Sequence, residues 1–249
     1  MYTFEYCFYP KTFESPAIDE FDDSMQWFLS ALYTNGQILY HYQNTVKFET
    51  HYACRVVAPE MDSLEETYWN VYCRDIFKKV VEQSKRKPYL RYIGKNYDVW
   101  DCCSCKDSSH YILLSEYAAY TSPVLCGDCL RAVPLYRLPK TYHDEYFDLL
   151  GWQKVHESCD RLFMNGIGER FGYKMIHDPK SHLSREGLRI CRFLEEATGK
   201  SFYYFLFQYY SKNKKTCPLC GKPWENKERT KIRYGYVCED CRLVSKDII

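Results

Sequence analysis

The spacing of hydrophobic and polar positions in residues 1–96 predicts strands that alternate with helices. Residues 2–9 are rich in aromatic side chains and end at a proline, which is typical of a strand. Residues 19–33 carry hydrophobic side chains three or four positions apart, which predicts a helix that closes at an Asn-Gly pair. Residues 37–43 and 45–57 then predict two consecutive strands.

The rest of this region predicts a second helix and a fourth strand. Ser63 and Glu66 have the spacing of a capping box, and the apolar stripe behind them predicts a helix that continues to about residue 83. Residues 88–93 predict the last strand. The order of elements is then βαββαβ, which matches the ferredoxin-like motif, so the predicted fold class is α+β.

The same pattern divides the chain into four segments. We predict a ferredoxin-like α+β domain at 1–96, a first four-cysteine zinc-binding module at 97–140, a helical domain at 141–211 and a C-terminal zinc ribbon at 212–249. The apolar run at 202–210 fits either a buried strand or a buried helix, and its periodicity leaves that choice open.

Four cysteines near the C-terminus follow the pattern C-x2-C-x17-C-x2-C: Cys217, Cys220, Cys238 and Cys241. Thiolates are soft ligands, and two intervening residues let both sulfurs of a pair turn onto one ion. The spacing is typical of a zinc ribbon. Pro218 and Gly221 favour the tight turn of a zinc knuckle. A redox Cys-x-x-Cys motif would explain one pair but not two.

An upstream set follows the pattern C-x2-C-x20-C-x2-C: Cys102, Cys105, Cys126 and Cys129. Cys103 is adjacent, and the sequence leaves open whether it replaces Cys102. We favour Cys102 because it gives the same spacing as the second pair. Gly127 would supply the knuckle turn. His110 is an alternative ligand, although a polar surface residue is the simpler interpretation.

Both sets offer four sulfur ligands, which complete a tetrahedral site and leave no position for water or substrate. We therefore predict two zinc ions with a structural role. Their binding would add folding free energy to segments that are too small to form cores of their own.

The composition fits a folded protein that keeps its cysteines reduced. Of the 249 residues, 46% are hydrophobic, which is enough to bury a core. The N-terminus does not resemble a secretory signal, and no segment approaches the roughly 20 apolar residues that a membrane span needs. We expect a cytoplasmic protein with no membrane partner, in which the 14 cysteines favour metal binding over disulfides.

The net charge is +1, so charge alone does not mark the chain as a polyanion binder. The charge is unevenly distributed, however. Residues 1–50 hold two lysines against seven acidic residues, residues 78–95 hold seven basic residues against one acidic residue, and residues 211–249 hold ten against five. The two basic segments permit contact with nucleic acid without requiring it.

In both basic segments, cations stand beside aromatic residues, which is the combination that binds single-stranded nucleic acid. The candidate contacts are Lys85, Arg86, Lys87, Arg91, Arg229, Lys231 and Arg233. Their aromatic neighbours in sequence are Tyr89, Tyr92, Trp224, Tyr234 and Tyr236. A solvated helix end, where the helix dipole favours cations, explains the first group equally well.

Enzymatic chemistry has little support in the sequence. His177, Asp178 and His182 could contribute to a catalytic metal site, but no third ligand at helical spacing accompanies them. The sequence has no phosphate-binding loop, nucleophile elbow or dinucleotide fingerprint. We therefore do not expect an enzyme.

Three stretches together resemble one bacterial family: CGDCLRAVPLYRLP at 126–139, GERFGYKMIHDPKSHLSREGLRICRFLEEATGKSFYYF at 168–205 and CPLCGKPWENKERTKIRYGYVCEDCRLVS at 217–245. Members of this uncharacterised family are described as zinc-ribbon-containing and as candidate nucleic-acid-binding proteins. The resemblance covers residues 95–245 well and the N-terminal part more loosely. It implies that the last four cysteines are ribbon ligands and that Cys126 and Cys129 form a matched pair. Cys103 has no place in the family pattern.

Two functions remain in competition. In the first, basic and aromatic ribbon hairpins contact nucleic acid without performing chemistry, and binding weakens as salt rises. In the second, the chain interacts with a protein, as an inhibitor, an immunity protein or an adaptor, through its acidic N-terminal region and its many tyrosines. We favour the first. An enzyme that uses His177 and His182 is the least supported.

Overall fold

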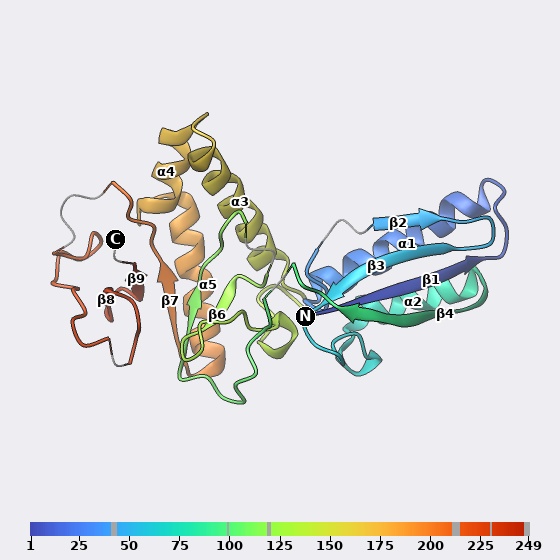
Figure 1. The fold of residues 1–249 in the computed structure, drawn as a ribbon, viewed down its shortest axis with the longest axis horizontal. Coiled ribbons are helices and arrows are strands. Elements are labelled where there is room, and N and C mark those ends of the chain that lie inside the picture. Colours follow the sequence, from blue (N-terminus) through green and yellow to red (C-terminus); the bar gives the residue numbers. More distant parts are fainter. Residues whose placement is uncertain (41–43, 99, 119–120, 211–214, 230, 247–249) are drawn as a thin grey trace. The chain divides into compact units, whose positions relative to one another are not determined.

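The computed structural model describes residues 1–40, 44–98, 100–118, 121–210, 215–229 and 231–246 (Figure 1). The chain forms two compact units, and each has its own sheet. Unit 1 contains residues 1–102 and 134–146, and unit 2 contains residues 103–133 and 147–249. The fold is therefore a mixed α+β arrangement, as the sequence predicts.

Unit 1 has one antiparallel sheet with two helices. Its strands are β1 (Tyr2–Pro10), β2 (Asn44–Lys47), β3 (Tyr52–Ala58) and β4 (Ser84–Lys95), its helices are α1 (Ala17–Thr34) and α2 (Val71–Glu82), and two short 3-10 turns are η1 (Glu66–Tyr68) and η2 (Leu135–Arg137). The strand order is β2-β3-β1-β4, and each neighbouring pair is antiparallel.

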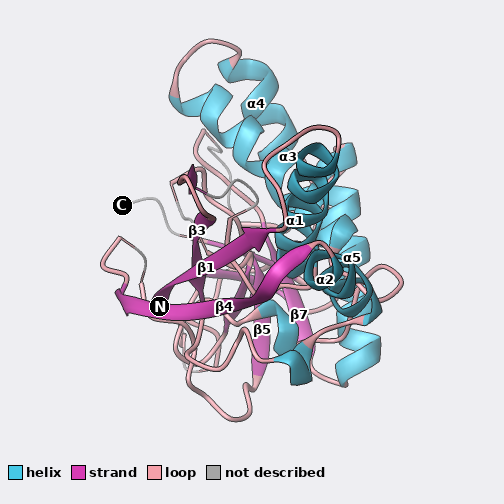
Figure 2. Ribbon diagram, turned by 90° about the vertical axis from the view of Figure 1, so that its right-hand side faces the viewer, coloured by secondary structure: helices cyan, strands magenta, loops and turns pink. Residues whose placement is uncertain are grey.

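The core of unit 1 lies between this sheet and its helices. Helices α1 and α2 lie together on one side of the strands (Figure 2). Side chains alternate along a strand, so Tyr6 and Phe8 of β1 point to the same face, and both contact Phe28 of α1 with ring centroids 5.6 and 6.4 Å apart. Phe28 also packs against Phe77 of α2 at 4.9 Å. Aromatic burial of this kind fixes both helices on one face of the sheet.

The two strands predicted at 37–43 and 45–57 have wrong boundaries, because the observed strands are β2 at Asn44–Lys47 and β3 at Tyr52–Ala58. Residues 37–39 form a bend, residue 40 is not in a strand, and residues 41–43 lie outside the described residues. At this bend Gln37 is buried, and its side-chain amide donates to Ser63 O at 2.6 Å. The predicted strand at 45–57 is interrupted by a turn, in which Phe48 N donates to His51 O at 2.8 Å.

The predicted capping box does not start the second helix. The Ser63 hydroxyl accepts from Glu60 N at 2.8 Å and donates to Glu60 O at 3.0 Å, so it stabilises a local turn. Helix α2 begins later, at Val71, where the side chain of Asn70 accepts from Cys73 N at 2.9 Å. Asn is among the strongest N-cap residues, and its geometry here is the one that satisfies a free helical N–H.

In its described residues, unit 2 combines short strands with three helices. Its strands are β5 (His110–Leu113), β6 (Val124–Cys126), β7 (Ser201–Phe205), β8 (Tyr236–Cys238) and β9 (Leu243–Ser245), and its helices are α3 (Phe147–Met164), α4 (Glu169–His177) and α5 (His182–Thr198). The strand order is β6-β5-β7-β9-β8. The apolar run at 202–210, which periodicity leaves open, therefore contains strand β7.

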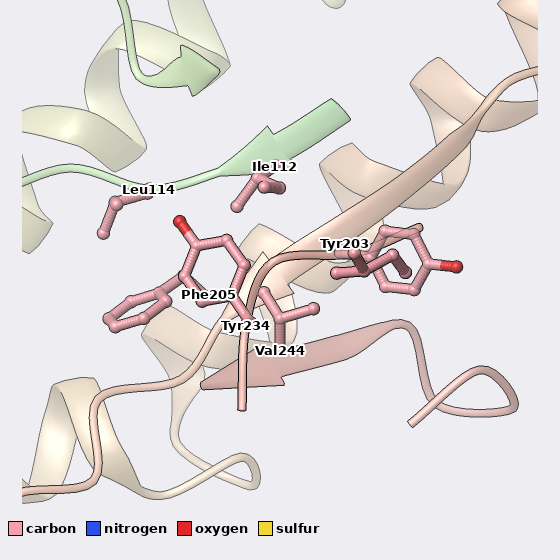
Figure 3. Close-up of a cluster of buried hydrophobic side chains, with 7 residues drawn as sticks. Ile112, Leu114, Tyr203, Phe205, Tyr234 and Val244 are labelled. Carbon is pink, nitrogen blue, oxygen red and sulfur yellow. The ribbon is translucent and has the colours of Figure 1, made fainter. Parts of the chain in front are cut away.

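One apolar cluster joins distant parts of unit 2. Ile112 of β5, Tyr203 and Phe205 of β7, and Val244 of β9 pack together with Tyr234 (Figure 3). Strands β5 and β7 are parallel, and so are β7 and β9. The C-terminal cysteine segment therefore shares a core with the strand that follows the helical segment.

Candidate metal centres

The C-terminal cysteines converge as their spacing predicts. The Sγ atoms of Cys217, Cys220, Cys238 and Cys241 all lie within 4.8 Å of one another. Cys220 Sγ and Cys238 Sγ are 3.6 Å apart. Sulfurs about 2.3 Å from a tetrahedral zinc ion lie about 3.8 Å from each other, so these separations suit one ion.

A tight turn and a strand end position these four sulfurs. Cys217 N donates to Lys222 O at 2.7 Å, and Gly221 N donates to Cys217 O at 2.9 Å. Gly221 has a φ of +75°, a conformation that glycine adopts without strain. Cys238 is the last residue of β8, and the turn after it carries Cys241. The backbone turn at 217–221 thus brings Cys217 and Cys220 together as a zinc knuckle.

The electrostatics of this group favour a thiolate at its exposed corner. A hydrogen bond from the backbone N–H of Lys222 lowers the pKa of Cys220 to about 7. Burial acts in the opposite direction on Cys238 and raises its pKa to about 11. A cation among the four sulfurs would offset that effect, because metal binding requires the deprotonated form.

The upstream cysteines also converge, but with one member exchanged. The four sulfurs that lie within 4.8 Å of one another belong to Cys103, Cys105, Cys126 and Cys129. The prediction that Cys102 joins this group is therefore wrong in its geometry. Cys102 Sγ instead donates to Pro59 O of unit 1 at 3.2 Å, while Cys103 belongs to unit 2.

Backbone hydrogen bonding explains the exchange. Cys103 N donates to Ala132 O at 2.7 Å, which holds Cys103 beside the chain that carries the second pair. Cys105 N donates to Cys103 Sγ at 3.3 Å. The Ser108 hydroxyl lies 3.1 Å from Cys126 Sγ. Although burial acts to raise it, this hydroxyl and neighbouring backbone N–H groups lower the pKa of Cys126.

His110 supports this group from outside it. His110 O accepts from Gly127 N at 2.9 Å, and the imidazole fills the space where a side chain at Gly127 would stand. A Cβ on Gly127 would lie 2.1 Å from His110 Nε2. Burial lowers the pKa of His110, and its Nδ1 lies 2.9 Å from the Ser109 hydroxyl. The ring therefore packs behind the knuckle and is not one of the four clustered groups.

The basic residues of β4 lie on an exposed edge strand. Lys85 is exposed, and Lys87 pairs with Glu66 at 3.0 Å. Arg91 pairs with Glu5 at 2.5 Å. The guanidinium carbon of Arg86 lies 3.5 Å from the centre of the Tyr9 ring.

The C-terminal cations are exposed, but two of their aromatic neighbours are not. Arg229, Lys231 and Arg233 reach solvent. Trp224 and Tyr234 are buried, at 2% and 6% exposure. The predicted pairing of ribbon cations with accessible rings is thus contradicted for these two residues, because Tyr234 belongs to the core cluster of unit 2 and Trp224 is buried beside Tyr236.

The histidines considered for catalysis form no metal group. His177 stacks on Tyr173, with ring centroids 4.1 Å apart. Within the described residues, the two cysteine groups are the only compact clusters of three or more His, Cys, Asp or Glu ligands. Every helix in the described part of the chain is too short or too polar to span a bilayer.

A further feature of unit 2 has no signal in the sequence. A largely apolar cavity of about 310 Å³ is lined by His156 and Ser245, among others, and each of these two has a buried polar atom without a hydrogen-bond partner in the described structure. Burial lowers the pKa of His156 to about 4. Such an imidazole is a weak base at pH 7. Periodicity could not reveal it, because His156 occupies a core position of α3.

Comparisons with known proteins support a bacterial family in which function is not assigned. Three family models match successive parts of the chain, each described as a domain of unknown function: DUF8589 at residues 1–94, DUF2310 at 105–207 and DUF8594 at 208–247. An uncharacterised protein of Haemophilus influenzae is 27% identical over 200 residues, covering 78% of this chain and 77% of its own length. A second is 31% identical over 140 residues, covering 54% and 69%. No solved structure matches the chain.

Proposed function

The chain belongs to the family of the Haemophilus influenzae protein to which it is 31% identical, and from this premise we propose that it is a non-enzymatic, zinc-stabilised protein that binds nucleic acid. The observation that carries the proposal is the convergence of four thiols at each of two places. Zinc with four sulfur ligands has no open position for a reactant, so both ions would act in folding.

The donor set of these sites suits zinc. Four sulfur donors within 4.8 Å of one another favour a soft or borderline cation with tetrahedral geometry. Hydrogen bonds from Cys105 N and the Ser108 hydroxyl to sulfur reduce the negative charge that four thiolates concentrate at the first group. Such outer partners are typical of resident metal sites.

We extend the proposal to the fold of each part. The βαββαβ order and the strand order β2-β3-β1-β4 support assigning unit 1 to the ferredoxin-like class. The turn at 217–221 and the β8–β9 hairpin support a zinc ribbon at the C-terminus. Exposed cations on β4 and at Arg229, Lys231 and Arg233 support contact with a phosphate backbone.

Two measurements on the purified full chain test the proposal. Elemental analysis is expected to give about two zinc ions per chain, and a fluorescein-labelled oligonucleotide is expected to bind with an affinity that falls steeply as salt rises. Near-zero metal would overturn the zinc sites. No binding at low salt would overturn the nucleic-acid function. A single protein partner that resists nuclease treatment would then favour an inhibitor or adaptor role.

A further inference from the structure

One face of the unit 1 sheet carries side chains that helices α1 and α2 do not cover. We call it the open face, and it consists of the β1 residues that alternate with those of the core and of their strand partners. A register shift between Cys7 and Tyr9 brings both Tyr89 and Arg86 of β4 to this face. Strand pairing sets its rows: Tyr9 lies opposite Arg86, Cys7 lies between Ala53 and Tyr89, and Glu5 lies between Arg55 and Arg91. Val46 extends the middle row on β2, opposite Ala53.

An aromatic stack crosses one end of the open face. Phe48 and His51 are stacked, with centroids 4.7 Å apart and planes at 8°. His51 stacks on Tyr9 at 5.1 Å and 18°. Tyr9 is near-parallel to Tyr89 at 6.1 Å, and the guanidinium carbon of Arg86 lies 3.5 Å from the Tyr9 centroid. Four rings and one guanidinium, drawn from distant parts of unit 1, thus form a single layered arrangement.

The ends of this stack are accessible. Inner ring faces contact one another, whereas Phe48 and Tyr89 at the two ends are 48% and 44% exposed. Val46, in the adjoining row, is 47% exposed. Exposed apolar side chains that gather beside one stack, and are not scattered singly, make this end of the face a candidate interaction site.

The neighbouring row supplies positive charge. Arg55 and Arg91 have side chains that are 65% and 59% exposed, and they flank Glu5. Glu5 is itself buried and pairs with both arginines, with Arg91 at 2.5 Å and with Arg55 at 3.8 Å, so its single negative charge is offset by two cations. With Arg86 in the stack, cations outnumber the one acid in these rows. Rows two residues apart are separated by roughly 7 Å, which is within the reach of a single nucleotide.

We propose that the open face binds single-stranded nucleic acid, with bases extending the aromatic stack at Phe48 and Tyr89 and phosphates contacting Arg55, Arg86 and Arg91. This inference rests on the nucleic-acid function proposed above and assigns it a surface and a substrate class. Rings offer stacking partners that every base can use, and arginines track the backbone without reading sequence. A duplex hides its base faces in its own stack, so single strands fit this surface better.

The test uses the zinc-loaded full chain and fluorescence anisotropy with labelled 20-nucleotide single-stranded DNA, single-stranded RNA and duplex DNA at low and moderate salt. Removing one stacked ring costs about 1–3 kcal/mol per base, so the double variant F48A/Y89A should lose about tenfold or more in affinity for single strands. The variant R55Q/R86Q should also bind more weakly and show a shallower salt dependence.

Matched controls separate surface chemistry from folding. W27A removes an exposed ring from α1, and K78Q/K79Q removes exposed charges from α2, on the helical side of the sheet. Both should stay within about twofold of the wild type. The variant F48L/Y89L removes the rings but keeps apolar bulk, so weakened binding in a protein of unchanged thermal stability supports stacking.

The outcomes distinguish the two proposals. If the wild type binds none of the three oligonucleotides, the nucleic-acid function and this inference both fail. If it binds but F48L/Y89L matches the wild type while R229Q/K231Q/R233Q loses affinity, the function stands and the open face is overturned. Equal affinity for duplex and single strands would also overturn the stacking arrangement.

Discussion

Each of the two cysteine groups brings four sulfurs together, but the two groups differ in what surrounds those sulfurs. In the upstream group, Gly127 packs directly against the buried ring of His110. In the C-terminal group, Gly221 has open space around it and needs only its positive φ. Cys220 is exposed, whereas every upstream member is at least partly buried. Both groups nevertheless use one knuckle conformation, since Leu130 N donates to Cys126 O at 2.8 Å with a φ of +58°, as Gly221 N does to Cys217 O. The upstream group adds close packing at Gly127 to this shared backbone conformation.

The largest expected effect is a difference in zinc content and stability between substitutions of the neighbouring residues Cys103 and Cys102. C103S should remove one zinc ion per chain and lower the free energy of unfolding of unit 2 by more than about 3 kcal/mol, because metal binding supplies folding free energy. C102S should keep both ions, since Cys102 Sγ contacts Pro59 O instead. Elemental analysis and thermal melts measure both. Loss of an ion in C102S with retention in C103S would reverse the assignment.

Metal removal should expose the difference in burial between the groups. When a chromogenic zinc chelator is added, we expect two phases of zinc release. The C-terminal site should release its ion at least about tenfold faster, because Cys220 is exposed. C220S should abolish the fast phase and leave the slow one. A single phase in the wild type would show that accessibility does not distinguish the sites.

Alanine at the two knuckle glycines should cost different amounts of stability. G127A forces a Cβ to 2.1 Å from His110 Nε2, and overpacking of this kind costs about 1–3 kcal/mol. G221A meets no neighbour but places alanine at positive φ, at a cost of about 1 kcal/mol. Chemical denaturation measures both. The double variant G127A/H110A should recover part of the loss, and a larger cost for G221A would contradict the packing argument.

The smallest effect concerns a surface ion pair beside the C-terminal group. Lys222 pairs with Asp240, and both side chains are more than half exposed. K222Q should leave the midpoint of thermal unfolding within about 1 °C of the wild type, because solvent screens such pairs. Zinc stoichiometry serves as the control. A shift of several degrees would mean that this charge pair, and not backbone conformation, holds the site together.

Local spacing predicts the candidate metal sites well because ligand geometry is local. Cys217 and Cys220 must turn onto one ion whatever the rest of the chain does, and the four C-terminal cysteines lie together as predicted. Choosing between Cys102 and Cys103 depends on a hydrogen bond to Ala132, about thirty residues away in sequence. The spacing of the cysteines does not contain that information, and for this reason it leads to the wrong choice of Cys102.

Long-range contacts also limit what the sequence predicts about surfaces. The sequence does not distinguish Trp224 and Tyr234 from accessible aromatic residues. Their burial depends on packing, of Tyr234 in the cluster with β7 and β9 and of Trp224 beside Tyr236 of β8. The stack of Phe48, His51 and Tyr9 depends on strand register across β1 and the β2–β3 turn. The βαββαβ order follows from periodicity, but the bend at 37–39, where a buried glutamine bonds to Ser63 O, does not.

The strand order of unit 2 places the two cysteine groups at opposite edges of its sheet. Its outermost strands are β6 and β8, and each ends in a clustered cysteine, Cys126 and Cys238. The outer edge of each strand is covered by its own cysteine loop, since Val133 N donates to Val124 O and Val237 N donates to Trp224 O. Loss of that cover would leave unpaired backbone groups that can recruit other chains. A metal ion at each edge of the sheet would hold both outer strands in place. We therefore expect the metal-free protein to self-associate through its exposed edge strands before it unfolds completely.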